Sequence, residues 1–580
     1  MKQIATWCLR QSAPLFGFLL FALAFTWPLA ANFSSYILSG TGDEFTVFWP
    51  FWYLPKAFLS PQWSILHSNL QIYPEGFALI YHTNFFVGSL LTAPISLLIS
   101  PPAALNTWLL LQLAFGGFFF FKFCQAHAMV SLPAFAGGLL YGFSPFVAAH
   151  LGGHYNLIQV AAPAAALYFS RMICVRLESN PENRKPVLWY AVALGIAVWM
   201  TAISDIYLGI MLLVLLPLFS IGDLISHLRL VRTPLLWQAV AVSIITAGLL
   251  MLPWILELRK VNAGGQYAVR YPAAGSQVVA SIKSFLLPES GHLLYKLLPA
   301  MLETHKQAGI LESTYLGLGA LMVATLGLFT RVQWKTAVLL FVGLITALIL
   351  STGNGYTENP GVPRPYDLGR YWPKIGPLQQ FRVPARWHFV AVTILAFLAA
   401  RGMQYFTQRP QRVFQILGGT LTVMLALDMW TGPRPVASAK PNDYFITNKL
   451  EKSGTLLAFP IGIASGAGGS MGQVHGSQII DQMAHELPIL SGYLARLSNR
   501  VMDNRKADRE LSTLMALQAG RYHPGTTLDW PAFIERYDIS HVTFPKDYRT
   551  NLPLMEILTN GFPVAETIET PNFILMKLRR

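Results

Sequence analysis

The stretch LWQAVAVSIITAGLLMLPWI, residues 236–255, contains no charged side chain. A helix of this length rises about 1.5 Å per residue and so reaches about 30 Å, the thickness of the hydrocarbon core of a bilayer. Similar apolar runs recur through most of the chain: 14–33, 105–124, 131–149, 155–172, 187–203, 205–226, 313–330, 336–351, 388–405 and 413–430. The sequence therefore predicts a polytopic α-helical membrane protein with about eleven transmembrane helices.

The composition of the 580-residue chain agrees with this prediction. Only 12% of the residues are charged and 53% are hydrophobic, whereas a soluble globular chain has about 25% charged residues. The 13% of aromatic residues excludes a disordered chain. The net charge of +14 does not indicate nucleic-acid binding, because Lys and Arg collect in short connections between apolar runs. The three cysteines cannot form a disulfide framework: Cys8, Cys124 and Cys174.

The basic connections set the orientation of the chain in the membrane. The connections richest in Lys and Arg are 171–185, 229–232, 331–335 and 409–412, and we place all four in the cytoplasm. The N-terminus is then cytoplasmic and the C-terminus lies on the exported side. The first apolar run is longer than the about 7–15 residues of a signal peptide, so we expect an uncleaved span there.

The segment 84–100 is the exception among the apolar runs. It is short, it contains Pro94, and it ends at Pro101-Pro102. A full span here would move the later basic connections to the wrong side of the membrane. We therefore expect a half-embedded or re-entrant segment shielded by protein, with a short span as the alternative.

This topology predicts two domains, a transmembrane domain over 1–430 and an exported α/β domain over 431–580. The transmembrane domain carries three exported loops, at 34–83, 257–312 and 351–387. In the exported domain, the pattern predicts strands at 455–460, 540–544 and 572–578, helices at 506–519 and 531–537, and a glycine-rich loop at 462–472.

Polar residues gather at the exported ends of the spans. The first exported loop carries Asp43-Glu44 and His82, and the later span ends carry His150, His154, Asn156, Asp205 and Tyr207. Arg382 and Arg386 lie in a loop that the positive-inside rule predicts to be poor in Arg. If the spans form one bundle, these groups converge on one exported cavity. A carboxylate beside guanidinium groups suits transfer onto a hydroxyl with an anionic leaving group.

These motifs resemble a known family. The doublet Asp43-Glu44 after the first span is similar to the acidic pair of the GT-C superfamily of integral-membrane glycosyltransferases. The order and spacing of several elements also resemble a large group of bacterial membrane proteins assigned to that superfamily: YPEG (73–76), YHTN (81–84), FSP (143–145), GHYNL (153–157), SDIY (204–207), RVPAR (382–386) and LPILSGYLAR (487–496). The resemblance implies a GT-C-like helix arrangement, a polyprenyl-phosphate sugar donor and an inverting displacement. It also implies an exported acceptor and the inner membrane of a bacterium.

The resemblance assigns roles to individual residues. Asp43 matches the loop-one acid and would be the general base, with Glu44 as the second acid. Arg382 and Arg386 would hold the donor phosphate. His82 stands in YHTN, where some relatives have HPP. Some relatives use a divalent metal such as Mg or Mn, for which the candidate ligands are Glu44, His154 and Asp205; the cofactor stays open.

Simpler interpretations of these residues also stand. Asp205 would cap the helix that follows it, Arg382 and Arg386 would anchor a span, and Trp49, Trp52 and Trp63 would be interfacial anchors. For the whole chain, the alternatives to a glycosyltransferase are a transporter or flippase of lipid-linked sugars and a non-enzymatic cell-envelope scaffold. The sequence shows no internal repeat of the kind that many transporters carry.

Overall fold

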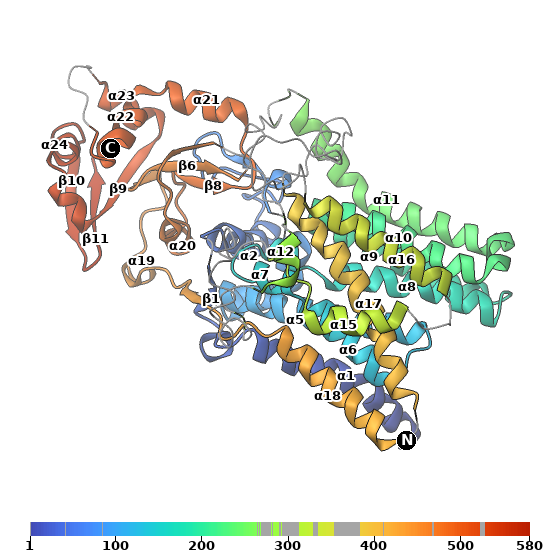
Figure 1. Ribbon diagram of the computed structural model, residues 1–580. Coiled ribbons are helices and arrows are strands. Elements are labelled where there is room, and N and C mark those ends of the chain that lie inside the picture. The colour runs from blue at the N-terminus through green and yellow to red at the C-terminus, as the bar shows by residue number, and fades with distance from the viewer. Residues whose placement is uncertain are drawn as a thin grey trace, which may run out of the picture.

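The structure, a computed structural model, combines a helical bundle with a mixed α/β region at one end of it (Figure 1). It describes residues 2–40, 42–83, 85–263, 265, 267, 280, 282–288, 292, 313–328, 334–352, 383–409, 411–466, 469–521 and 528–579. The bundle contains the helices α1 (Lys2–Phe25), α5 (Pro101–Ala126), α6 (Ser131–Gly142), α8 (Ala161–Ser179), α9 (Arg184–Ser204), α10 (Ile206–Ser226), α11 (Pro234–Asn262), α15 (Leu318–Leu328), α16 (Trp334–Ser351), α17 (His388–Thr407) and α18 (Arg412–Asp428).

Every predicted span coincides with a helix of this bundle. Within the described ranges, eight helical segments are long and apolar enough to cross a membrane. The other three predicted spans correspond to α1, whose apolar part is Ser12–Phe25, and to the shorter helices α15 and α18. The predicted polytopic membrane fold is therefore confirmed.

The segment 84–100 forms two short helices rather than one span. Helices α3 (Phe86–Leu91) and α4 (Ala93–Leu98) have six residues each and meet at Thr92. Each reaches about 9 Å, too short to cross the hydrocarbon core. The Ser96 hydroxyl donates a hydrogen bond of 2.7 Å to the backbone oxygen of Phe51, so this segment contacts the helix that contains Phe51. These observations favour the re-entrant interpretation.

Glycines allow the helices of the bundle to pack closely. Helices α15 and α17 touch along their backbones at Gly327 and Gly402, where a Cβ on Gly402 would lie 2.0 Å from the backbone oxygen of Val323. The Phe18 ring of α1 likewise fills the space beside Gly117. Small residues at helix crossings are typical of membrane proteins, because packing between helices replaces the hydrophobic effect there.

The C-terminal region contains two small sheets. The four-stranded sheet has the order β10-β11-β9-β5, from β5 (Thr455–Ala458), β9 (Ile539–Pro545), β10 (Val564–Glu569) and β11 (Phe573–Leu578). Strand β5 is parallel to β9, and the other pairs are antiparallel. The helices around the sheets are α19 (Asp443–Thr447), α20 (Gly476–His485), α21 (Asn499–Ala507), α22 (Arg509–Gln518), α23 (Trp530–Arg536) and α24 (Leu552–Asn560). The predicted strands and helices all have counterparts here.

The prediction of a loop at 462–472 was wrong. Strands β6 (Gly462–Ser465) and β7 (Ser470–Gly472) form a hairpin, and β8 (Gly492–Leu494) pairs with β6 in parallel. A Cβ on Gly462 would lie 2.4 Å from the backbone of Gln473, so this glycine serves the close approach of two strands. Glycine in a strand often marks such an approach.

The first long loop, residues 34–83, and the C-terminal region form one packed body. Strand β1 (Tyr36–Leu38) pairs with β4 (Val436–Ser438). Helix α2 (Glu44–Leu59) packs its aromatic side chains against Ile463, Ile479 and Leu494. Trp49 and Trp52 are buried in this cluster, so the expectation that these two anchor the chain at the membrane interface was wrong; Trp63 is partly buried and packs against the cluster. Their apolar area stabilises the contact between the two regions instead.

Candidate active site

Asp43 lies in the turn between β1 and α2, at the end of the bundle that faces the C-terminal region (Figure 1). The chain turns at Gly42, whose φ of +86° favours glycine. The preceding Gly40 approaches Gly152 closely, since a Cβ on Gly40 would lie 3.3 Å from the backbone oxygen of Gly152. This approach brings the loop of Asp43 beside the loop of His154.

Asp43 and His154 form a direct pair. The Nε2 atom of His154 lies 3.1 Å from Oδ2 of Asp43. The Tyr493 hydroxyl, from strand β8, donates a second hydrogen bond to the Asp43 carboxylate. Burial raises the pKa of Asp43, but the hydrogen bonds from His154 and Tyr493 and the charges of His154 and Arg386 outweigh it and hold the pKa below its ordinary value. Asp43 is therefore ionised at neutral pH.

Two other predicted residues form a second pair. Asp205 caps α10 by accepting hydrogen bonds from the backbone N–H groups of Tyr207 at 2.7 Å and Leu208 at 3.3 Å. Its other carboxylate oxygen accepts a bond of 2.6 Å from the amide of Asn156. The capping interpretation of Asp205 is confirmed, and the cap also fixes the loop that carries His154.

Arg386 lies beside Tyr207, the residue whose backbone N–H donates to Asp205. It is in the short helix η8 (Pro384–Trp387), and its guanidinium lies 4.9 Å from the centre of the Tyr207 ring. Its charge also acts on Asp43. Arg382 lies outside the described residues.

Glu44 and His150 each have a hydrogen-bond partner of their own. Glu44 is 2% exposed and accepts a hydrogen bond of 2.5 Å from the Ser39 hydroxyl. His150 is buried, its Nδ1 atom 2.6 Å from the Phe146 backbone oxygen, and its ring centre lies 5.8 Å from that of His154. The chain leaves the helix after His150, so the two histidines do not share a helix face.

His82 is buried among aromatic side chains. Its Nε2 atom lies 3.2 Å from the Thr46 backbone oxygen, and its ring packs edge-on against Trp49 and Phe77. Burial lowers the pKa of His82 to about 4. The neutral ring therefore belongs to the packed core of the first exported loop, and nothing in its contacts links it to a substrate.

The described side chains near Asp43 do not fit a divalent metal. No three of the His, Cys, Asp and Glu side chains in the described ranges come together. Among the candidate ligands, His154 pairs with Asp43, Asp205 bonds to Asn156, and Glu44 bonds to Ser39. A metal ion needs several such oxygen or nitrogen ligands around one point. The described side chains near Asp43 do not provide such a set.

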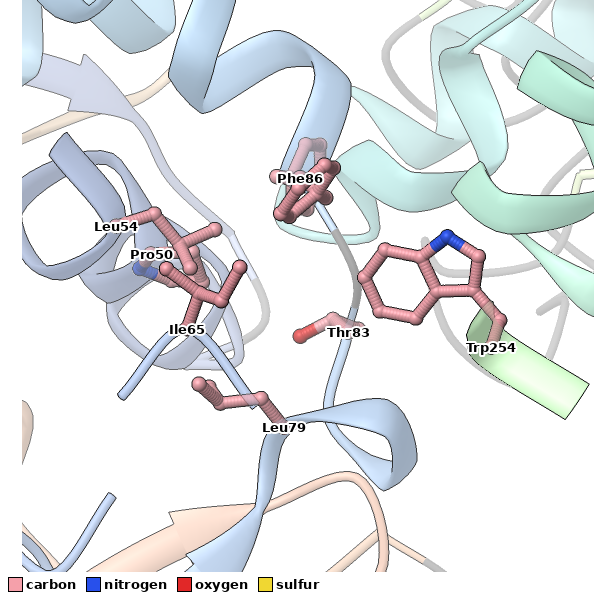
Figure 2. Close-up of a pocket in the computed structure, with 8 residues that line it drawn as sticks. Pro50, Leu54, Ile65, Leu79, Thr83, Phe86 and Trp254 are labelled. Carbon is pink, nitrogen blue, oxygen red and sulfur yellow. The ribbon is translucent and has the colours of Figure 1, made fainter. Parts of the chain in front are cut away.

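A small apolar pocket lies along α2 (Figure 2). It is lined by Pro50, Leu54, Ile65, Leu79, Thr83, Phe85, Phe86 and Trp254. The Thr83 hydroxyl points into it, and Phe86 and Trp254 meet edge to face at 4.9 Å. Trp254 belongs to α11, whose Leu252 and Leu256 are about half exposed, so the pocket adjoins the lipid-facing surface of the bundle.

Sequence reasoning did not select Tyr493 or Ser39. Tyr493 lies within the LPILSGYLAR element at 487–496, so the motif was recognised but none of its residues was assigned to the site. Nothing in the local sequence marks Ser39, which stands four residues before Asp43 and acts on Glu44.

Comparison with known proteins shows which solved structures have a similar fold. No family model and no curated protein sequence matches the chain. Among solved structures, it is similar to the arabinofuranosyltransferase AftD from Mycobacteria, with a TM-score of 0.57 and 13% identity over 98% of this chain. The chain spans 41% of the length of AftD.

Two further solved structures show weaker similarity. ArnT from Cupriavidus metallidurans, bound to undecaprenyl phosphate, has a TM-score of 0.47 and 10% identity over 97% of this chain and 98% of ArnT. The Archaeoglobus fulgidus oligosaccharyltransferase has a TM-score of 0.46 and 10% identity over 95% of this chain and 71% of its own. The match to AftD agrees with the predicted fold: this chain has a polytopic membrane fold similar to that of AftD.

Proposed function

We propose that this protein is a glycosyltransferase that moves a sugar from a polyprenyl-phosphate donor to an acceptor on the exported side of the membrane. The observation that carries the proposal is the ionised Asp43 carboxylate beside His154 and within the field of Arg386. The GT-C fold supports it, because this fold is shared with AftD, an arabinofuranosyltransferase. Fold alone does not decide function, so the argument rests on the site.

In the proposed reaction, Asp43 accepts a hydrogen bond from the acceptor hydroxyl. The hydroxyl oxygen attacks the anomeric carbon of the sugar, and the bond between that carbon and the phosphate oxygen breaks with inversion. The electron pair of the broken bond leaves with the phosphate, and the hydroxyl proton passes to Asp43. Because the pKa of Asp43 is lowered, its main contribution before the transition state is to orient the hydroxyl.

The charges around Asp43 suit the other half of this reaction. Arg386, together with Arg382, would bind the departing phosphate through its guanidinium group. The stacking of Arg386 near Tyr207 would hold that guanidinium in place. His154 would keep the Asp43 carboxylate oriented, with Asn156 and Asp205 supporting the loop of His154.

The pocket along α2 suits the hydrocarbon part of the donor. Its lining is apolar except for the Thr83 hydroxyl, and it adjoins the membrane-exposed helix α11. We assign it to the prenyl chain. The family resemblance favours the inner membrane of a bacterium as the location. The charge distribution favours a cytoplasmic N-terminus and an exported C-terminal domain over 431–580.

Mass spectrometry of lipids that co-purify with the protein tests the donor class. A bound polyprenyl-phosphate sugar is the expected result. That lipid then serves as the donor probe, and its consumption by the protein in membranes of the source cell gives the rate. Asp43→Asn should slow consumption by about 10²–10⁴-fold, the usual contribution of a general base.

The control for this experiment is Asp443→Asn, because the Asp443 side chain is 79% exposed and lies outside the site. It should leave the rate unchanged. Equal donor consumption by Asp43→Asn and wild type would remove Asp43 from the reaction. Movement of the lipid between leaflets without loss of its sugar would instead favour a flippase.

A further inference from the structure

The connection between α10 and α11 is a short 3₁₀ helix, η4 (Leu228–Arg232), whose faces differ in chemistry. A 3₁₀ helix has about three residues per turn, so side chains three positions apart lie one above the other. Leu228 and Val231 therefore share one face, and Arg229 and Arg232 share the next. One short turn thus presents an apolar pair beside a basic pair.

The third face of η4 fixes the direction of the other two. Leu230 is 7% exposed and belongs to the apolar cluster that includes Ile173 of α8 and Leu235 of α11. Leu228, by contrast, is 69% exposed and Val231 is 37% exposed. Both arginines of η4 are exposed as well. The apolar face and the basic face therefore both point away from the bundle.

Trp237 in the first turn of α11 extends the apolar face. Its indole N–H donates a hydrogen bond of 2.9 Å to the Val231 backbone oxygen, and the residue is 57% exposed. Exposed tryptophans are typical of the boundary between hydrocarbon and headgroups, since one end of the ring is apolar and the other is polar. Further along α11, Ile244, Ile245 and Leu249 are exposed, so η4 adjoins the lipid-facing surface of this helix.

The arginines of the basic face have no acidic partner in the described part of the chain. Glu178, at the end of α8, pairs with Arg171 at 3.2 Å and with His227 at 3.6 Å instead. A 3₁₀ helix rises about 2.0 Å per residue, so the backbones of Arg229 and Arg232 lie about 6 Å apart along the axis. Two guanidinium groups that start from such close positions can bind the same phosphate.

We propose that η4 and Trp237 form a binding site for the headgroup of an anionic phospholipid. Arg229 and Arg232 bind the headgroup phosphate, and the apolar pair Leu228 and Val231 lies against the upper part of the acyl chains. A soluble anion would contact only the basic face, whereas a lipid covers both faces. The charge pattern predicts that this connection is cytoplasmic, and the cytoplasmic leaflet has a negative surface potential. The inference does not depend on the proposed glycosyltransferase function.

Native mass spectrometry of the full chain, released from a non-ionic detergent, measures this binding. The probe is phosphatidylglycerol, and zwitterionic phosphatidylcholine is the comparison lipid. Each basic residue near a membrane surface contributes a factor of about five to the binding of anionic lipid. Arg229→Gln combined with Arg232→Gln should therefore weaken phosphatidylglycerol binding by about 25-fold and leave phosphatidylcholine binding unchanged. Arg229→Lys combined with Arg232→Lys keeps both charges and should bind phosphatidylglycerol much more tightly than the Gln variant.

The matched control is Lys506→Gln combined with Arg509→Gln, which also removes two exposed basic side chains three positions apart, but in the C-terminal region. It should leave phosphatidylglycerol binding unchanged. A phosphatidylglycerol with a photoreactive headgroup locates the site in lipid nanodiscs. Adducts should form on 228–237 in wild type and should be lost in the Gln variant of η4.

Equal phosphatidylglycerol affinity of wild type and the Gln variant of η4 would overturn the proposal. An equal loss of affinity in the Lys506 and Arg509 control would also overturn it, because attraction by net charge would then explain the binding. Displacement of the lipid by an excess of inorganic phosphate would assign the basic face to a soluble anion and not to a lipid. Adducts that form elsewhere and survive the η4 substitutions would move the lipid site away from η4.

Discussion

The contact between Glu75 and Arg505 offers a quantitative test of how the C-terminal region is attached to the first exported loop. Arg505 on α21 is 0% exposed, and one of its guanidinium nitrogens lies 2.5 Å from Oε2 of Glu75. The same nitrogen donates to the Tyr73 backbone oxygen, and the guanidinium lies 4.8 Å from the centre of the Tyr537 ring. Glu75 belongs to the YPEG element, which the structure therefore places at a joint between two regions.

Substitution of Glu75 by Ala leaves the buried Arg505 without its carboxylate. Removing one partner of a buried ion pair costs about 3–5 kcal/mol. Because the Glu75 side chain is 26% exposed and Arg505 keeps its hydrogen bond to the Tyr73 oxygen and its cation–π contact with Tyr537, we expect the lower end, about 3 kcal/mol. This free energy corresponds to an increase of about 100-fold in the population of the opened joint, since about 1.4 kcal/mol equals a factor of ten.

Hydrogen exchange measures that opening. The amides of Ile72, Tyr73 and Ile489 close the joint through backbone hydrogen bonds, so their exchange reports its opening free energy. In Glu75→Ala, these amides should exchange about 100-fold faster, while amides in the core of α17 should not change. Glu569→Ala is the control, because its pair with Lys546 is exposed and such pairs contribute about 0–1 kcal/mol.

A second substitution separates charge from packing. Arg505→Met added to Glu75→Ala removes the buried charge that the single change left behind. The double variant should therefore exchange more slowly than Glu75→Ala alone. Wild-type exchange in Glu75→Ala, or equally fast exchange in the double variant, would refute the claim that this pair holds the joint.

Two further changes test the pH dependence and the packing of the fold. Burial raises the pKa of Asp481 to about 6 in the folded protein, so folding favours the protonated form and stability falls as pH rises from about 4 to about 6. Asp481→Asn keeps an acceptor for the Asn442 N–H and should raise the melting temperature at pH 7 but not at pH 4; an equal change at both would contradict this. Gly402→Ala forces α15 from α17 and should destabilise the bundle by about 1–3 kcal/mol in thermal unfolding. Gly419→Ala, which meets nothing within 4 Å, should not, and equal stability of the two variants would refute the crossing argument.

Most of the fold could be predicted because its signals are local. Each apolar run of the predicted length is a helix, since the bilayer imposes that length on any spanning segment. The proximity of Asp43 and His154 agrees with the predicted convergence of polar groups, because both residues were placed at span ends on the same side of the membrane, but their direct pairing was not predicted. The cap by Asp205 followed from a local rule for helix termini.

The errors concern long-range contacts. Aromatic residues in α2 fit an interfacial belt and a protein core equally well by composition, and only the approach of Ile479 and Leu494 decides for the core. The glycines at 462–472 are typical of a loop by local rules. Strand β6 nevertheless forms there because it pairs with β8, which lies much later in the chain. Tyr493 could not be assigned because its partner lies 450 positions earlier, since 493 minus 43 is 450.

The pairing of β1 with β4 has a consequence for biogenesis. Leu38 emerges from the ribosome long before its partner Val436, and a ribosome adds about 5–20 residues per second. The 398 residues from Ser39 through Val436 therefore take about 20–80 s to synthesise. During that interval β1, which precedes Asp43, has no strand partner, and its pairing waits until the ribosome reaches β4.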